Sequence, residues 1–256
     1  QTGVKNTFHA AVDVVGKTSD IKTLDIAGHL HNRNGKHVTS HQNEHIIKCL
    51  SSIYEKSTWK NYEILVVENN SEKPETFEYY KNLSWRYPKA RVLTWKEGFN
   101  YAAINNFAAK RAKGDLLLFL NNDTEFIDAG TLRELVISAL LPGSGASGAM
   151  LYYDDDTIQH GGITIGLGGF AANALWSLTD RDEKYFPFSI CEHEMSGVTA
   201  ACLMVQKEVY EQVGGFDEAF VVALNDVDFC LKIREAGYGI LFNPYAKLYH
   251  YESKSR

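Results

Sequence analysis

The chain has 256 residues, which is enough for one large domain or two small ones. Hydrophobic residues make up 45% and charged residues 23%, as in an ordinary globular protein, and the net charge of −6 argues against a general nucleic-acid-binding surface. No apolar run approaches 18 residues, so the sequence predicts no transmembrane helix. Because the chain opens on Gln1, we leave open that it is a piece of a longer protein.

Apolar periodicity predicts an alternation of helices and strands in the first half of the chain. In chain order we expect a helix at 44–57, a strand in "EILVVENNS" (63–71) and another at 90–95, and a helix at 100–114. A strand at 115–120 and a helix at 132–140 capped by Thr131 follow. For the second half we expect a strand at 198–205, helices at 207–215 and 226–238, and two short closing strands, "GILFNP" and "AKLYHYE". This alternation predicts a mostly parallel α/β sheet.

Two of the predicted strands end in clusters of small polar side chains. One strand runs into Glu68–Ser71, and the apolar run at 116–120 stops at Asn121, Asn122 and Asp123. A simple turn would explain one such cluster. Because ligands of open α/β sheets bind beyond the carboxyl ends of the strands, two clusters indicate the edges of a ligand site. The glycine-rich stretch at 160–174 matches neither a P-loop nor a dinucleotide fingerprint.

An ordered set of motifs resembles the family 2 inverting glycosyltransferases of the GT-A fold, especially bacterial polysaccharide and rhamnosyltransferase-like members. The matching stretches are "YEILVVENNS", "FNYAAINNFAAKRAKGDLLLFLNNDTE", "IQHGGITIGLGG", "VTAACLMVQKEVYEQVGGFDEAF", "NDVDFCLKIREAGY" and "YHYESKSR". The resemblance implies a nucleotide-diphospho-sugar transferase fold, a mostly parallel central sheet flanked by helices. It covers residues 44–256, with 44–126 as the nucleotide-binding half and 127–256 as the acceptor and catalytic half.

The N-terminal segment, residues 1–43, departs from the family. The family opens with a buried strand, whereas "NGKHVTSHQNEHI" at that place is polar. Either "FHAAVDVV" (8–15) or "KTLDIAGHL" (22–30) is a candidate for the missing first strand, and the sequence does not decide between them.

The resemblance also implies roles for particular residues. Asp123 aligns with the last carboxylate of the family's metal motif and His250 with its C-terminal metal histidine, so the implied cofactor is Mn²⁺ or Mg²⁺. Asp226 aligns with the general base, for which helix capping is the simpler alternative. The residues implied to bind the donor are Glu68, Asn69, Asn100, Asn105, Asn121 and Asn122, and those implied at the acceptor or sugar are Asp217 and Asn225. Asn121 and Asn225 replace carboxylates of the family.

The implied activity is transfer of a sugar, with inversion, from a UDP- or dTDP-sugar to a glycan or lipid-linked saccharide in polysaccharide biosynthesis. A non-catalytic sugar-nucleotide or glycan-binding module of a larger synthase is the alternative, and the two Asn replacements favour it. A nucleotidylyltransferase would need a glycine-rich basic loop that we do not find. Four widely spaced cysteines, interpreted as reduced, and glycosylation sequons inside the predicted site favour a cytoplasmic location, at the inner face of the membrane if other domains attach it there.

Overall fold

The structure is a computed structural model that describes residues 7–14, 24–27, 41–179 and 187–251. Its strands are β1 (Thr7–Val14), β2 (Leu24–Ala27), β3 (Glu63–Asn69), β4 (Ala90–Trp95), β5 (Leu116–Leu120), β6 (Thr124–Phe126), β7 (Ser144–Tyr152), β8 (Ile158–His160), β9 (Ile163–Ile165), β10 (Ala171–Asn173), β11 (His193–Glu194), β12 (Cys202–Gln206) and β13 (Gly239–His250). Its helices are α1 (His41–Lys56), α2 (Pro74–Lys81), α3 (Leu83–Arg86), α4 (Tyr101–Ala109), α5 (Thr131–Ala139), α6 (Lys207–Gln212) and α7 (Asn225–Glu235), with a 3₁₀ turn, η1 (Leu167–Gly169).

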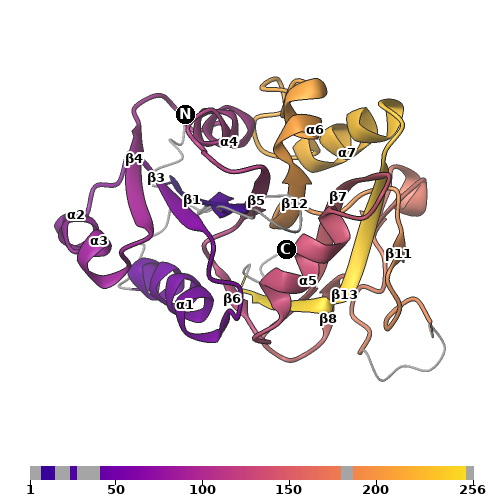
Figure 1. Cartoon of the computed structure of the whole chain (residues 1–256), viewed down its shortest axis with the longest axis horizontal. Coiled ribbons are helices and arrows are strands. Elements are labelled where there is room, and N and C mark those ends of the chain that lie inside the picture. Colours follow the sequence, from indigo (N-terminus) through magenta and orange to yellow (C-terminus); the bar gives the residue numbers. More distant parts are fainter. Residues whose placement is uncertain (1–6, 15–23, 28–40, 180–186, 252–256) are drawn as a thin grey trace.

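One large sheet runs through the molecule, with helices on both faces (Figure 1). Its strand order is β11-β13-β7-β12-β5-β2-β1-β3-β4, with β6 added to β13 and β8 to β7. The pairs β3–β4, β2–β5 and β7–β13 are parallel, while β12 runs antiparallel to both β5 and β7. The α/β class is therefore confirmed, but the sheet is mixed rather than mostly parallel. The chain enters β12 from an irregular segment instead of a crossover helix, so β12 runs in the reverse direction.

The central strand β5 is buried on both faces, as its continuous apolar run predicts. Leu116, Leu118 and Leu120 pack with α1 and α5 in one core cluster. Leu117 and Phe119 point the other way and pack with α4, α6 and α7 in a second cluster. This period-2 alternation divides the apolar core into two layers and leaves the carboxyl end of β5 between them.

Strand β7 is absent from our expectations because its sequence, "SGASGAMLY", consists largely of small residues with low strand propensity. The fold requires two of these glycines. A Cβ on Gly145 would lie 2.4 Å from Cγ2 of Ile233, and one on Gly148 would lie 2.4 Å from Cβ of Val198. The composition that hides the strand thus permits close packing against α7 and the segment before β12.

Three local predictions need correction. The strand expected at 198–205 begins only at Cys202, and residues 198–201 form an irregular segment. The two expected closing strands form one strand, β13. It pairs with β7 along both parts, and the register of this pairing shifts between Asn243 and Lys247. Thr131 does not cap α5: Gly130 is the N-cap, and the Thr131 hydroxyl donates to the Lys247 carbonyl instead, at 3.2 Å.

Both N-terminal candidates for the missing strand enter the sheet. β1 pairs with β3 in the antiparallel sense, and β2 pairs with β5 in parallel. β1 and β2 thereby connect β3 and β4 with β5 and the remaining strands of the sheet. Of the residues that the structure describes, no helix is long and apolar enough to cross a membrane.

Candidate active site

Pairing of β6 with β13 brings together the two predicted metal ligands, which are 127 positions apart in the chain. In the register of this pair His250 lies opposite Thr124, and the Tyr251 N–H donates to the Asp123 carbonyl at 2.8 Å. Nε2 of His250 then lies 3.3 Å from Oδ1 of Asp123. The pair therefore sits just beyond the carboxyl end of β5, where a ligand of an α/β sheet is expected.

A glutamine on β8 sets the orientation of the His250 ring. The Gln159 amide N–H donates to the His250 carbonyl at 3.3 Å, which leaves Oε1 of Gln159 to accept from Nδ1 of His250 at 2.6 Å. Nδ1 therefore carries the proton, and Nε2 directs its lone pair towards Asp123. A histidine that donates its other ring N–H to a carbonyl oxygen is the usual arrangement of a metal ligand.

The carboxylate of Asp123 is only partly exposed. Burial acts to raise its pKa, but the adjacent His250 and His45, when their rings are protonated, outweigh this effect, so the pKa of Asp123 then lies below its usual value. Asn121 approaches the same histidine, with Nδ2 of its side chain 3.1 Å from Nε2 of His250. Oδ1 of Asn121 is buried and has no hydrogen-bond partner among the described residues, and the same is true of both polar atoms of Asn122.

These groups fit a divalent cation bound together with a substrate phosphate. The described residues contain no cluster of three His, Cys, Asp or Glu side chains, so Asp123 and His250 would supply two ligands. The unpartnered oxygen of Asn121 is a third donor at the same place. Mg²⁺ and Mn²⁺ typically take one or two protein carboxylates and complete their shell with phosphates and waters, and an imidazole suits Mn²⁺ better than Mg²⁺.

Asp226 lies in the first turn of α7, and the residue just before the helix has an unusual backbone. Leu224 adopts a left-handed conformation with φ of 66°, which is disfavoured for a branched side chain and is often found at functional sites. The Asp226 carboxylate accepts from the Val227 N–H at 2.9 Å, and the Thr199 hydroxyl and the Ala200 N–H lie near enough to it to lower its pKa as hydrogen-bond donors. Burial raises the pKa of Asp226, and these hydrogen bonds only partly oppose the rise.

Residues 198–201, hereafter the 198–201 segment, connect the two parts of the site. The Ala201 carbonyl accepts from the Asn121 N–H at 2.9 Å, while Thr199 and Ala200 hold Asp226. Asn121, beside the metal-ligand pair, and the expected base Asp226 therefore both neighbour one short stretch of chain.

The predicted donor residues at the end of β3 differ in what they contact. Oε1 of Glu68 accepts from the Ser71 N–H at 2.6 Å, whereas its buried Oε2 has no partner among the described residues, and burial raises the pKa of this carboxyl. The side chain of Asn69 donates instead to the carbonyls of Trp95 and Glu97, at 3.2 and 2.9 Å. Glu68 thus has a free acceptor, whereas Asn69 ties the loop after β4 to β3.

Two predicted asparagines lie on α4. Oδ1 of Asn100 caps the helix by accepting from the Ala103 N–H at 3.0 Å, and its Nδ2 donates to the Glu218 carbonyl at 2.8 Å. Asn105 is buried, donates to the Tyr101 carbonyl at 2.9 Å, and keeps an unpartnered Oδ1. Asn100 is therefore engaged in holding the loop at 214–218, while Asn105 retains a free oxygen.

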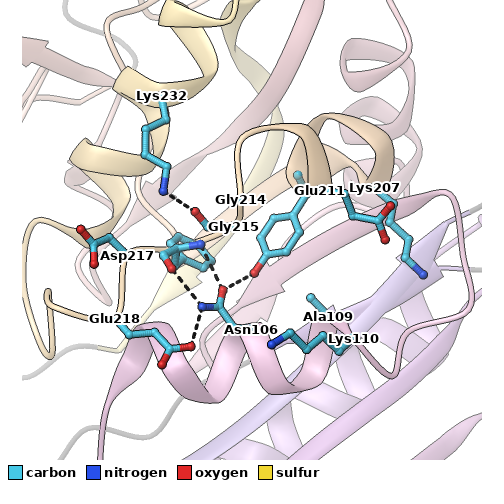
Figure 2. Close-up of a pocket in the computed structure, with 12 residues that line it drawn as sticks. Asn106, Ala109, Lys110, Lys207, Glu211, Gly214, Gly215, Asp217, Glu218 and Lys232 are labelled. Atoms are coloured by element: carbon cyan, nitrogen blue, oxygen red, sulfur yellow. Dashed lines mark hydrogen bonds between the residues drawn. The ribbon is translucent and has the colours of Figure 1, made fainter.

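Asp217 lies in that loop, beside a pocket of about 590 Å³ between α4, α6 and α7 (Figure 2). The pocket is organised around Asn106, which donates to the Phe216 carbonyl and to Glu218 and accepts from Tyr210 and the Phe216 N–H. Asp217 is exposed and accepts from the Ala219 N–H at 2.9 Å. Asp217 thus lies in a surface loop, and among the described residues its hydrogen bond joins it to neither Asp123 nor Asp226. Asn225, in contrast, is buried beside Asp226 with an unpartnered Nδ2.

Three residues of the site are missing from the sequence-based set: Gln159, His160 and Thr199. The first two belong to "IQHGG", a motif that contributed to the family resemblance without receiving a role. A buried glutamine and threonine carry no distinctive signal, and only their contacts in the fold connect them with His250 and Asp226.

Comparison with known proteins assigns the family. The sequence profile described as "Glycosyl transferase family 2" matches residues 38–214. The chain belongs to this family. Among its relatives are the O-antigen biosynthesis protein RfbC of Myxococcus xanthus, 41% identical over 209 residues, and the protein y4gI of Sinorhizobium fredii, 39% identical over 208 residues. Each alignment covers 81% of this chain but only 16% and 23%, respectively, of the relative.

A third relative, the N-acetylglucosaminyl-diphospho-decaprenol L-rhamnosyltransferase of Mycobacterium tuberculosis, is 25% identical over 191 residues, which are 66% of this chain and 61% of that protein. Solved structures confirm the GT-A fold. GalNAc-T7 with UDP, GalNAc and Mn²⁺ aligns with a TM-score of 0.65 at 16% identity, over 81% of this chain and 40% of that one. The mannosyltransferase PcManGT of Pyrobaculum calidifontis with GDP-Man and Mn²⁺ gives 0.62 at 17%, over 85% and 56%.

Proposed function

We propose that this family 2 chain is a catalytic domain that transfers a sugar from a nucleotide-diphospho-sugar to a saccharide acceptor with inversion at the anomeric carbon. The observation that carries the proposal is the arrangement around the 198–201 segment. A carboxylate–imidazole pair suited to a divalent cation lies beside Asn121, which the segment holds, and a half-buried carboxylate with a raised pKa neighbours the same segment.

In this proposal Asp123 and His250 hold Mn²⁺ or Mg²⁺, which would neutralise part of the charge of the departing diphosphate. Asp226 takes the proton of an acceptor hydroxyl. The hydroxyl oxygen forms the new bond to the anomeric carbon from the face opposite the diphosphate, and the old bond to the diphosphate oxygen breaks. The raised pKa of Asp226 suits this role because a base nearer the working pH is a stronger proton acceptor.

The donor side of the proposal uses the groups with unpartnered atoms. The free Oε2 of Glu68 is suited to accept from a ribose hydroxyl or a base N–H, and Asn105, Asn121 and Asn122 carry further buried polar atoms without partners. We assign residues 44–126 to nucleotide binding and residues 127–256 to the acceptor and the chemistry. Asn225 and Asp217 remain assigned to the acceptor or sugar, and Asn69 and Asn100 support the donor site through the loops they hold.

We infer a UDP- or dTDP-sugar as donor and a glycan or lipid-linked saccharide as acceptor, in the synthesis of a surface polysaccharide. The names of the relatives from M. xanthus and M. tuberculosis support this class of product. We also infer that the domain works on the cytoplasmic side, at the membrane if other domains attach it there. Two glycosylation sequons begin at Asn69 and Asn122, both buried, so glycans at these positions are incompatible with the fold.

The alternative is a sugar-nucleotide or glycan-binding module without catalysis. The observation that favours it is the replacement of family carboxylates by Asn121 and Asn225. Release of nucleoside diphosphate separates the two, because a binding module retains the donor without breaking it down.

The test is a screen of UDP-, dTDP- and GDP-sugars with Mn²⁺, in which release of nucleoside diphosphate is measured with and without a lipid-diphosphate-linked saccharide. We expect release by the wild type, and a fall of at least about 100-fold in Asp226→Asn because a lost general base costs that much. Asn225→Asp is the matched control, in which only the neighbouring position changes. Tight donor binding without release by the wild type would support the binding module, and full activity of Asp226→Asn would refute the assigned base.

A further inference from the structure

His160 lies on β8, next to the glutamine that orients His250, and contacts a different part of the site. Its Nε2 accepts from the Thr199 N–H at 3.3 Å, and its Nδ1 lies 2.7 Å from Oδ1 of Asn173. Asn173 is an exposed residue of β10, in the glycine-rich hairpin that follows β8. His160 itself is 1% exposed, so its ring connects a surface hairpin with the interior.

The hydrogen bonds determine which nitrogen of His160 carries the proton. The Thr199 N–H can only donate, so Nε2 must be the acceptor, and Nδ1 carries the proton that it donates to Asn173. Burial lowers the pKa of His160 to about 4, and the neighbouring His250 adds to the fall, so the ring is neutral near pH 7. The neutral ring therefore contributes no charge, and its two hydrogen bonds fix the position of Thr199 relative to Asn173.

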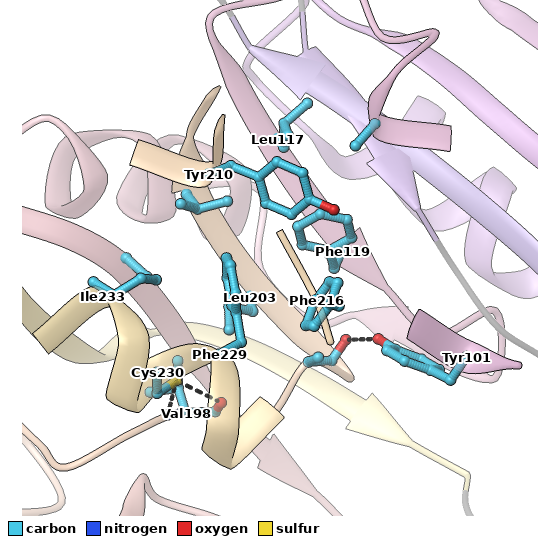
Figure 3. Packing of buried hydrophobic residues seen from close by; sticks show 14 of the residues in the cluster. Tyr101, Leu117, Phe119, Val198, Leu203, Tyr210, Phe216, Phe229, Cys230 and Ile233 are labelled. Carbon is cyan, nitrogen blue, oxygen red and sulfur yellow. Dashed lines mark hydrogen bonds between the residues drawn. The ribbon is translucent and has the colours of Figure 1, made fainter. Parts of the chain in front are cut away.

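Two further side chains, those of Tyr101 and Cys230, hold the 198–201 segment (Figure 3). The Tyr101 hydroxyl donates to the Ala200 carbonyl at 3.0 Å, and the Cys230 thiol contacts both the N–H and the carbonyl of Val198, at 3.5 and 3.6 Å. Between these two anchors lies Thr199, whose N–H is held by His160 and whose hydroxyl lies near enough to Asp226 to lower the pKa of its carboxyl. Movement of Thr199 would therefore carry the Asp226 hydrogen bonds with it.

We propose that His160 is a positioning residue for Asp226: through Thr199 it holds the 198–201 segment against the carboxylate, and through Asn173 it makes that geometry depend on the β9–β10 hairpin. The role of Asp226 as base belongs to the proposed function, on which this inference rests. The arrangement at Thr199 is an observation of the fold and can be tested without any transfer reaction.

Loss of the imidazole should loosen Thr199 while leaving the metal-ligand pair in place, because His250 is held separately by Gln159. Misplacement of a catalytic group by about 1 Å can cost up to about 100-fold in rate. We therefore expect His160→Leu to reduce nucleoside diphosphate release by about 10- to 100-fold with little change in donor affinity. His160→Gln places an amide oxygen near the former Nε2 and should recover most of this loss.

The first measurement is the titration of the Asp226 carboxyl by ¹³C NMR in protein labelled at aspartate, with Asp226→Asn identifying the signal. Two titratable neighbours, Tyr101 and Cys230, have pKa values raised by burial and stay neutral through the acid range. We expect the Asp226 midpoint to rise in His160→Leu, because the carboxylate loses the Thr199 and Ala200 hydrogen bonds, and to stay near the wild-type value in His160→Gln. Asn173→Ala, an exposed substitution that leaves the buried ring in place, should shift the midpoint in the same direction by less.

The second measurement is nucleoside diphosphate release by the same variants, from the sugar nucleotide that the wild type turns over fastest. If His160→Leu and Asn173→Ala only lower the melting temperature, with the Asp226 midpoint and the rate unchanged, the residue is merely structural and the inference is refuted. If the wild type releases no nucleoside diphosphate, the proposed function fails, while the NMR titration still decides whether His160 positions Asp226.

Discussion

By the family resemblance, Asn121 stands where a metal-binding carboxylate is expected, and its Nδ2 lies 3.1 Å from Nε2 of His250. An amide in place of a carboxylate removes one negative charge, so a bound cation would depend more strongly on Asp123. Nδ2 of Asn121 would also compete with a metal for the lone pair of Nε2. Rotation of the amide would exchange this N–H for the unpartnered Oδ1, which is a ligand atom.

We predict that Asp123 and His250 contribute unequally to metal-dependent nucleotide binding. Asp123→Ala should abolish the gain in affinity for UDP or dTDP that Mn²⁺ produces, because the only carboxylate of the pair is lost. His250→Ala should reduce the gain without abolishing it, because a neutral ligand offsets none of the cation's charge. Calorimetry of the nucleotide with and without Mn²⁺ measures both. The reverse ranking would show that the two ligands are assigned the wrong way round.

Gln159 should control metal affinity without touching the metal. Replacement by Leu removes the acceptor of the Nδ1 proton and frees the His250 ring to change tautomer or rotate. Loss of such an outer partner typically costs about 10- to 100-fold in metal affinity, so we expect Mn²⁺ binding to weaken by that factor in Gln159→Leu. Gln159→Glu keeps an oxygen at the same place and serves as the control. Unchanged Mn²⁺ affinity in Gln159→Leu, measured by electron paramagnetic resonance, would exclude this role.

At this scale a sequence can single out a candidate residue only where that residue carries a distinctive chemistry. Asp123, His250 and Asp226 stand out as a carboxylate after a buried strand, a histidine in a recognisable motif and an acid at a helix start. Gln159 and Thr199 are ordinary residues, and their relevance depends on which side chain the fold places beside them. The sequence also does not reveal that the side chains of Asn69 and Asn100 form hydrogen bonds with backbone groups.

Among the elements, β7 shows why small residues can be essential in a sheet. It lies between β12 and β13, and Gly148 on it faces Val198, the first residue of the 198–201 segment. Sequence patterns predict apolar strands such as β4 and β5 close to their observed bounds, whereas the helix expected at 100–114 ends at Ala109. They miss β7 because its residues have low intrinsic strand propensity. The close packing of Ile233 and Val198 against it, which only glycine permits, specifies this strand instead.

A methyl group at position 148 should therefore disturb the fold locally. In Gly148→Ala the new Cβ would lie 2.4 Å from Cβ of Val198, so either β7 or the 198–201 segment must move. Overpacking of this kind costs about 1–3 kcal/mol, and we expect a loss of that size in urea unfolding. Gly130→Ala, where a Cβ would meet nothing within 4 Å, is the control.

The double variant Gly148→Ala/Val198→Ala tests the stated cause. Removal of the valine methyl groups that the new Cβ would meet at 2.6 and 2.8 Å should recover part of the lost stability. If the double variant is less stable than the two single changes added together, the clash with Val198 is not the cause.

Across the whole molecule, residues 44–126 and residues 127–256 both contribute strands to a single sheet, and the candidate site lies beyond the carboxyl end of β5. The α/β class and the family were predictable because the motifs occur in the same order as in the family even where single residues are substituted. The mixed pairing of the sheet was not, because strand direction follows from how the chain enters each strand, as at β12. The N-terminal strands β1 and β2 were predicted only as alternatives, and both are inserted between β3 and β5.

The site also imposes a cost on the stability of the whole chain, and this cost should be measurable at Asp226. Burial raises the folded-state pKa of this carboxyl above its ordinary value of 3.8. A charged Asp226 therefore destabilises the fold at any pH above its folded pKa, and the cost disappears below about pH 4, where both the folded and the unfolded forms are protonated. Asp226→Asn removes the charge and keeps the shape.

We accordingly predict that Asp226→Asn melts at a higher temperature than the wild type at about pH 7.5, and that the difference shrinks as the pH falls towards about 4. Asp228→Asn is the matched control: it removes the same charge from the same helix turn, but it breaks an ion pair with Lys232 at 3.7 Å and should give no gain. Melting curves of the three proteins across this pH range provide the measurement. If Asp226→Asn is no more stable than the wild type at neutral pH, Asp226 is well accommodated as an anion, and its proposed strength as a base loses its physical support.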